Sequence, residues 1–300
     1  MNKKQLQSSL LLLVTALIWG TAFVAQSVAM DYIEPFTFNA IRFLLGGTVL
    51  LPVIAVGTKK MRKAEKGTGT DRSEKKLLWK GGIICGVALC VASALQQFGI
   101  QGTTVGKTGF VTALYIVLVP VFGVFLHKKA GIKLWISVLV AIFGLYLLCM
   151  KAESFSVNHY DVILLFCAAA FAVQILYVDY FSPKLDAVKL SCIQFYVCGL
   201  LSLVMMLLTE HPDPGAILVA WKPVLYTGVM SCGVAYTLQV VGQKNLNPVI
   251  ASLIMSLEAV ISAIAGWVIL GQHLSRREIA GCVVMFAAIL LAQLPTGSRE

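Results

Sequence analysis

The chain has 300 residues, of which 58% are hydrophobic and only 13% are charged. A soluble domain needs roughly 25% charged residues to cover itself with a hydrated surface, so this composition excludes a soluble globular protein. The formal charge of +10 would suit a nucleic-acid-binding protein, but the basic residues lie in short segments between apolar blocks, where they act as topology signals instead.

The apolar residues form blocks of about 20, the length that a helix needs to cross roughly 30 Å of hydrocarbon. In chain order, transmembrane helices are predicted over 9–29, 36–56, 80–101, 106–126, 131–150, 159–180, 189–208, 219–241, 248–270 and 276–294. The first apolar run is too long for a signal-peptide core and is predicted to remain as a span. Local unwinding or bending is expected at Gly20, Pro120 and Pro248.

Lysine and arginine residues are distributed unequally between alternate loops. With the N-terminus inside, 18 of the 24 fall in cytoplasmic segments and five on the opposite side, while Arg42 lies inside a span. Cytoplasmic loops of membrane proteins are enriched in these residues. Both termini are therefore predicted to be cytoplasmic, in a multi-pass protein of the cell (inner or plasma) membrane.

The residue types that usually carry catalysis or bind metals are not clustered in the sequence. All eight cysteines lie in apolar segments without metal-site spacing, and the four histidines lie far apart, at predicted span ends or in loops. The sequence contains no nucleotide-binding loop. It therefore predicts no cofactor and no metal, and it argues against an enzyme.

The two halves of the chain share short motifs. Three stretches of the first half return in the second: LQxxG at 95–99 and 238–242, IxFxxxG at 41–47 and 193–199, and an apolar stretch at 120–148 and 264–292. Their similar offsets, 143, 152 and 144, indicate duplication of a five-helix unit, with the two repeats predicted at 1–150 and 151–300.

An odd number of helices in each unit turns the second unit upside-down relative to the first. The predicted fold is therefore an all-α integral membrane protein, with ten transmembrane helices arranged as two inverted five-helix repeats. Inverted repeats are typical of secondary transporters, in which a site near the midplane is exposed to each side in turn. A channel, a membrane sensor or assembly partner, and a membrane-embedded enzyme are the alternative classes.

Several motifs resemble the EamA family of the drug/metabolite transporter superfamily: Trp19-Gly20, Asn39-x-x-Arg42-Phe43, and Leu257-Glu258 followed by Gly271-Gln272-x-Leu274-Ser275 and Gly281. The resemblance extends over nearly the whole chain in two repeats. It implies a ten-helix exporter or exchanger of metabolites such as amino acids. The sequence departs from the family pattern at Ala259, where a proline usually follows the glutamate and bends the helix. It also departs at Gln272 and Lys128, where the ninth and fourth helices usually end in an acidic residue.

Glu258 is the first candidate site residue, because it lies near the middle of the predicted span 248–270. A carboxylate at that depth costs about 2.5–3.5 kcal/mol or more to insert, so such residues normally face a hydrated cavity, pair with another group or stay protonated. We therefore expect Glu258 to bind substrate, and proton coupling through it is a hypothesis. The alternative is a neutral carboxyl group that hydrogen-bonds between helices.

Arg42 lies about seven residues into the second predicted span, toward its outer side. Its guanidinium group suits an anionic group of a substrate, and snorkelling to the headgroups is the alternative. Further polar and aromatic residues within the spans are predicted to line the same substrate site, with simple helix packing as the alternative for each. They are Trp19, Asn39, Thr112, Tyr115, Tyr236 and Ser256.

The repeat also relates polar residues near opposite faces of the membrane. Arg42 and Gln96 fall near the predicted outer face, and their counterparts Gln194 and Gln239 near the inner face. Matched polar groups at opposite mouths suit a pair of alternating gates, so Gln96, Gln194 and Gln239 are predicted gating residues. Hydrogen bonds between packed helices are the alternative.

These features together predict a secondary transporter of small metabolites, with amino acids or related zwitterions as candidate substrates. Its expected partners are a small-molecule substrate and the lipid bilayer, and not a nucleic acid. A neutral or cationic metabolite fits Glu258 and the aromatic residues nearly as well as a zwitterion. The sequence leaves the direction of flux, the coupling ion and the oligomeric state open.

Overall fold

The computed structural model describes residues 3–64, 72–103, 105–125, 131–149, 158–270 and 275–293. Within these ranges the chain is almost entirely helical and contains no strand. The helices are α1 (Lys3–Met30), α2 (Pro35–Ala64), α3 (Arg72–Ile100), α4 (Val105–Ala113), α5 (Tyr115–Phe125), α6 (Ile132–Cys149), α7 (His159–Phe181), η1 (Ser182–Lys184), α8 (Ala187–Thr209), α9 (Pro214–Val219), α10 (Trp221–Tyr226), η2 (Thr227–Tyr236), α11 (Thr237–Gln243), α12 (Pro248–Met255), α13 (Glu258–Leu270) and α14 (Arg276–Gln293).

Each range predicted as a span coincides with one of these helices or with consecutive shorter ones. In the described part of the chain, eight segments are long and apolar enough to cross a membrane, and α6 and α14 contain shorter apolar stretches. The predicted ranges 106–126, 131–150 and 276–294 each end on a residue outside the described part, as do the family departures at Lys128 and Gln272.

Several helices begin at short polar residues that bind the free backbone N–H groups of the first turn. The side chain of Asn158 accepts a hydrogen bond from the backbone N of Asp161, and the Asp161 carboxylate accepts one from the backbone N of Asn158, which forms a capping box at the start of α7. Asp186 caps α8, and Asn247 caps α12. These polar residues separate consecutive apolar helices.

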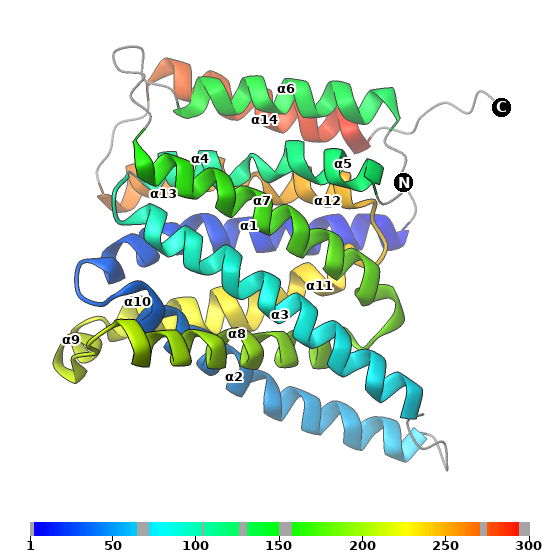
Figure 1. Ribbon diagram of the computed structural model, residues 1–300. Helices are drawn as coiled ribbons and strands as arrows, with labels where there is room; N and C mark the ends of the chain where they lie inside the picture. Colours follow the sequence, from blue (N-terminus) through cyan, green and yellow to red (C-terminus); the bar gives the residue numbers. More distant parts are fainter. Residues whose placement is uncertain are drawn as a thin grey trace.

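The helices form one bundle in which elements from the two halves of the chain alternate (Figure 1). The most extensive packing joins α2 to α8, α3 to α7 and α8, and α6 to α14. The pair α6 and α14 forms a layer along one edge of the bundle. The start of α1 and the end of α14 lie at the same end of the bundle.

Two of the predicted spans are interrupted in the middle. Residues 105–125 form α4 and α5 with a turn at Leu114, and residues 248–270 form α12 and α13 with a turn at Ser256 and Leu257. Bending was expected at Pro120 and Pro248 in these ranges, but the breaks lie instead at Leu114 and at Ser256 and Leu257. The second break lies directly before Glu258 although Ala259 stands where the family has a helix-bending proline.

Gly20 does not unwind its helix, contrary to expectation, because α1 is continuous from Lys3 to Met30. A Cβ atom at Gly20 would lie 2.4 Å from Cβ of Ile261. This glycine is therefore required by the close approach of α1 and α13, a common use of small residues in packed membrane helices. Pro248 is the first residue of α12, and Pro120 lies inside α5.

Candidate functional site

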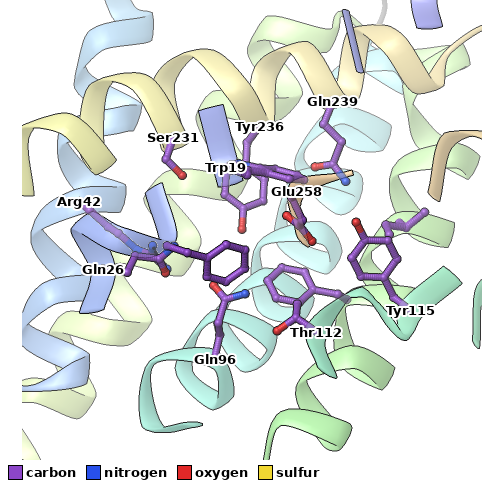
Figure 2. A pocket seen from close by; sticks show the side chains of 13 residues that line it. Trp19, Gln26, Arg42, Gln96, Thr112, Tyr115, Ser231, Tyr236, Gln239 and Glu258 are labelled. Carbon is purple, nitrogen blue, oxygen red and sulfur yellow. Dashed lines mark hydrogen bonds between the residues drawn. The ribbon is translucent and has the colours of Figure 1, made fainter. Parts of the chain in front are cut away.

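A cavity lies in the middle of the bundle, where the interrupted spans meet α1, α2, α3, α7, η2 and α11 (Figure 2). Its lining includes residues from both halves of the chain: Trp19, Phe23, Gln26, Arg42, Gln96, Thr112, Tyr115, Phe171, Ile175, Ser231, Tyr236, Gln239 and Glu258. The cavity is narrow, with a volume of about 20 Å³. One or two water molecules fit this space, and a larger ligand requires the helices or side chains to move apart.

The two helix breaks place Tyr115 and Glu258 at this cavity. Tyr115 is the first residue of α5, and Glu258 is the first residue of α13. Each therefore stands at the N-terminal end of a half-helix, where the backbone dipole favours negative charge. Interrupted membrane helices whose half-helix ends meet at the midplane are a recurring way to build substrate sites in transporters.

Arg42 and Gln26 lie together at one end of the cavity (Figure 2). The Arg42 side chain is 1% exposed, and its Nη1 atom donates a hydrogen bond to Oε1 of Gln26 at 3.0 Å. The rings of Phe38 and Phe43 lie 4.9 and 4.8 Å from the guanidinium carbon. Atoms Nε and Nη2 have no hydrogen-bond partner among the described residues. A buried guanidinium with free donors is equipped to bind an anionic group.

Glu258 lies at the other end of the cavity as seen in Figure 2, with Tyr115 and Gln239. Glu258 is 4% exposed, and no cation in the described part of the chain forms an ion pair with it. The hydroxyl group of Tyr115 faces this carboxyl group in Figure 2. A carboxyl group at this depth without an ion pair among the described residues is available to bind a cationic group or a proton.

Aromatic side chains occupy the wall between the two polar ends. The ring centroids of Trp19 and Tyr236 lie 4.6 Å apart. Behind them, Phe43 and Phe195 lie 6.0 and 6.1 Å from the Tyr236 ring. These rings are tilted or edge-on to one another and present an apolar surface, which suits the uncharged part of a small ligand and can also attract a cationic group.

The structure brings most of the predicted site residues together. The cavity lining includes Trp19, Arg42, Tyr115, Tyr236, Glu258, Gln96 and Gln239. Asn39, Ser256 and Gln194 are fully buried but do not line it. Ser256 donates to the Leu253 carbonyl at 2.8 Å, as the residue that follows α12. The amide groups of Asn39 and Gln194 find no partner among the described residues.

The predicted gating glutamines are not separated as the sequence suggested. Gln96 and Gln239 line the same central cavity, rather than opposite mouths, and Gln194 lies apart from it. Gln96 and Gln239 occupy equivalent positions of the repeat.

Thr112, also named from the sequence, lines the cavity as well, whereas five lining residues were not predicted: Phe23, Gln26, Phe171, Ile175 and Ser231. Gln26 carries the clearest sequence signal, since it is a lone amide in the first apolar run. Phe23, Phe171 and Ile175 have the composition of ordinary packing residues, and only the fold distinguishes them from other apolar residues of the same spans.

The fold and this cavity define an α-helical, multi-pass membrane protein with a polar site enclosed inside its bundle. The sequence model of the EamA-like transporter family matches twice, over residues 6–150 and 160–294. The chain therefore belongs to the EamA-like transporter family.

Relatives of known description agree with this family. An uncharacterized transporter of Archaeoglobus fulgidus is 27% identical, over 97% of this chain and 87% of that protein. The uncharacterized transporter YwfM of Bacillus subtilis is 24% identical over 94% and 92%, and the chloroplastic WAT1-related protein At3g02690 of Arabidopsis thaliana is 23% identical over 93% and 68%.

A solved crystal structure shares the fold, with a TM-score of 0.74 at 19% identity over 96% of both chains. Family and relatives identify the chain as a membrane transporter of the cell membrane, with a small-molecule substrate and the lipid bilayer as its partners. They indicate a transporter and not an enzyme.

Proposed function

We infer that the protein is a secondary transporter of small zwitterions, amino acids or related compounds, that works by alternating access and is coupled to protons. The observation that carries this proposal is the pairing of Arg42 and Glu258 in one buried cavity (Figure 2). A zwitterion presents an anionic and a cationic group on a small frame, and the two ends of the cavity offer the complementary charges. The aromatic wall accommodates the apolar part.

The packing supports two inverted five-helix repeats. In the first pair of equivalent contacts, α3 packs on α7, and η2 with α11 packs on α1. In the second pair, α4 with α5 packs on α7, and α12 with α13 packs on α1. In each pair, the second contact is the first one with every span replaced by its counterpart in the other repeat. A two-fold axis in the membrane plane requires such pairs of contacts. With α6 and α14 as the fifth and tenth spans, both termini lie on one side, which the excess of Lys and Arg assigns to the cytoplasm.

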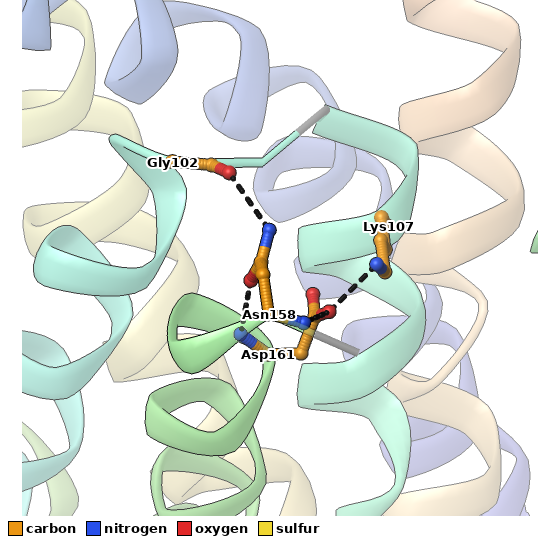
Figure 3. A network of polar contacts seen from close by, with 4 residues as sticks. All are labelled: Gly102, Lys107, Asn158 and Asp161. Carbon is orange, nitrogen blue, oxygen red and sulfur yellow. Dashed lines mark hydrogen bonds and ion pairs between the residues drawn. The ribbon is translucent and has the colours of Figure 1, made fainter. Parts of the chain in front are cut away.

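Alternating access is supported by contacts between the halves at the predicted outer end of the bundle. Nζ of Lys107, on α4, lies 2.7 Å from Oδ2 of Asp161, on α7, and Asn158 Nδ2 donates to the Gly102 carbonyl at 3.4 Å (Figure 3). Together with the narrow cavity, these contacts describe a closed arrangement. Substrate entry then requires the halves to rock apart, with Gln96, Gln194 and Gln239 as candidate gating residues.

Each charged residue has a defined task in this mechanism. Arg42 binds the substrate carboxylate through Nε and Nη2, while Gln26 holds the guanidinium group in place through Nη1. Glu258 binds the substrate ammonium group when it is ionised. When the carboxyl group is protonated it no longer attracts a cation, so proton binding and substrate binding compete at the same oxygen atoms. This competition provides the coupling between the two fluxes.

The test is uptake into liposomes that contain the purified protein, with a panel of amino acids and small amines, with and without an imposed pH gradient. We expect uptake that follows the gradient in the wild type and in Glu34→Gln, an exposed carboxylate outside the cavity that serves as the matched control. Glu258→Gln should abolish the response to the gradient. Gradient-driven uptake that survives in Glu258→Gln would reject Glu258 as the proton carrier, and uptake of amines but not of amino acids would reject the zwitterion.

A further inference from the structure

Three glutamines lie in the contact between α7 and α11 that adjoins the cavity. Gln174, Gln239 and Gln243 are 0%, 1% and 1% exposed. Nε2 of Gln239 donates to Oε1 of Gln174 at 3.2 Å, and Nε2 of Gln243 donates to the Ile175 carbonyl at 3.3 Å. These two hydrogen bonds connect α7 to α11. In the predicted repeats, α7 is the first span of the second repeat and α11 is the end of its third span.

The same three amides keep unused hydrogen-bonding atoms. Nε2 of Gln174, Oε1 of Gln239 and Oε1 of Gln243 have no partner among the described residues. Turning over both amides of the Gln174–Gln239 pair exchanges donor and acceptor but leaves as many atoms unpaired. Turning over Gln243 would direct its oxygen at the Ile175 carbonyl, which is repulsive. The unpaired atoms therefore follow from the arrangement of the two helices.

Interhelical hydrogen bonding alone does not account for this arrangement. A single amide pair would hold the helices together, and leucine residues of similar size would pack without unpaired polar atoms. Buried polar groups that find no protein partner are normally hydrogen-bonded to ordered water, which needs two to four polar partners. Donors and acceptors at successive levels of two facing helices provide such partners.

The three glutamines follow one another from the cavity toward one end of the bundle. Gln239 and Ile175 line the cavity, and Gln243 follows four residues later on α11, about 6 Å further along the helix axis. Gln243 is the last residue of α11, at the end of the bundle that the Lys and Arg distribution assigns to the cytoplasm. Gln239 lies with Glu258 at the same end of the cavity in Figure 2.

We propose that Gln174, Gln239 and Gln243 bind a chain of water molecules between the cavity and the cytoplasmic end of α7 and α11, along which Glu258 exchanges its proton. On release, the O–H bond of the Glu258 carboxyl group breaks and its proton passes to the first water. Each water accepts one proton and passes one on, and the last releases it to the cytoplasm. The titratable groups that line the cavity with Glu258 are Tyr115 and Tyr236, with Arg42 at the far end. On α7, Cys167 also interacts electrostatically with Glu258, and the buried Asp179 lies five residues after Gln174.

The hydration of this path is tested without any substrate. Gln243→Cys is labelled with a small, water-soluble thiol reagent added from the cytoplasmic side, and the modified peptide is quantified by mass spectrometry. Thiols react as thiolates, which requires water. The matched control is Gln97→Cys, since Gln97 is also fully buried with an unpaired Oε1 atom but lies near the outer end of α3. Labelling at position 243 should be at least about tenfold faster than at position 97. Equal rates would overturn the water chain.

The role in proton exchange rests on the proposed function and is tested by transport. Gln174→Leu and Gln243→Leu should slow uptake driven by a pH gradient about tenfold, while substrate exchange at equal pH, which moves no net proton, stays within about twofold of the wild type. Gln97→Leu should leave both rates unchanged. Equal slowing of both processes would reduce the glutamines to structural residues. If uptake by the wild type does not respond to the pH gradient, the proposed proton coupling is wrong. The labelling result would still decide whether the path contains water.

Discussion

Glu210 receives two hydrogen bonds from Thr37, one from the backbone N and one from Oγ1, both at 2.7 Å. A third, from the backbone N of Phe36, is also 2.7 Å long. Glu210 follows the last residue of α8, and Phe36 and Thr37 lie in the first turn of α2. The carboxylate from one half of the chain therefore caps a helix of the other half, where the helix dipole also favours its charge.

Removing this interhelical cap should destabilise the fold. Glu210→Ala leaves the N–H groups of Phe36 and Thr37 without an acceptor in a buried place, so we expect the free energy of unfolding to fall by about 1–3 kcal/mol. Thermal melting of the purified protein in detergent measures this. Glu34→Ala is the comparison, because among the described residues the carboxylate of the exposed Glu34 accepts one hydrogen bond, from His211 N at 3.1 Å. A melting temperature no lower for Glu210→Ala than for Glu34→Ala would contradict the capping role.

The ion pair between Lys107 and Asp161 allows a graded comparison (Figure 3). Asp161→Ala removes both the ion pair and the hydrogen bond that completes the α7 capping box, whereas Lys107→Met removes the ion pair of a side chain that is 33% exposed and leaves the capping box in place. Partly exposed ion pairs contribute up to about 1 kcal/mol, and a helix cap about as much again. Melting temperatures should therefore rank wild type, Lys107→Met and Asp161→Ala in falling order. The reverse order of the two variants would show that the cap contributes little.

Helix positions and several site residues follow from the sequence because the bilayer imposes a length on every span and a high cost on buried charge. Glu258 and Arg42 are conspicuous for that reason, and both line the cavity. Asn39 shows the limit of the same reasoning. It lies three residues before Arg42 on α2 and is equally buried, yet it does not reach the cavity. The depth of a residue in the membrane can be predicted from the sequence, whereas the direction of its side chain depends on how its helix is rotated in the bundle.

The helix breaks were also beyond sequence reasoning. The turn at Ser256 and Leu257 contains neither glycine nor proline, and the turn at Leu114 is followed by an ordinary tyrosine. Local propensity would continue a helix through both positions. The breaks depend on tertiary packing around the cavity. Tertiary packing also brings both Gln96 and Gln239 to its lining, although their distances from the span ends suggested opposite faces.

The contact of α1 with α13 predicts a large effect of a small substitution. In Gly20→Ala the new Cβ would lie 2.4 Å from Cβ of Ile261 and 2.9 Å from the backbone oxygen of Glu258, so α13 must shift. Overpacking of this kind costs about 1–3 kcal/mol. We expect a lower melting temperature and slower transport, because the shifted segment carries Glu258. Gly106→Ala is the control, since a Cβ there meets nothing within 4 Å. Equal melting temperatures for the two variants would argue that α1 and α13 are less tightly packed.

Arg42 should determine the preference for a carboxylate group. Arg42→Lys keeps the charge but loses the planar pair of donors, Nε and Nη2, that can bind both oxygens of a carboxylate. We expect its KM for amino acids to rise about tenfold, equivalent to about 1.4 kcal/mol of lost binding. Methyl esters of the same amino acids, which lack the carboxylate, should show little change, and Lys222→Gln, an exposed cation on α10, should affect neither series. Inhibition of uptake by each series in liposomes measures both constants. If Arg42 only supports the cavity wall, Arg42→Lys should weaken the binding of esters and free amino acids alike. The collapse of a cavity wall does not depend on which end group the ligand carries.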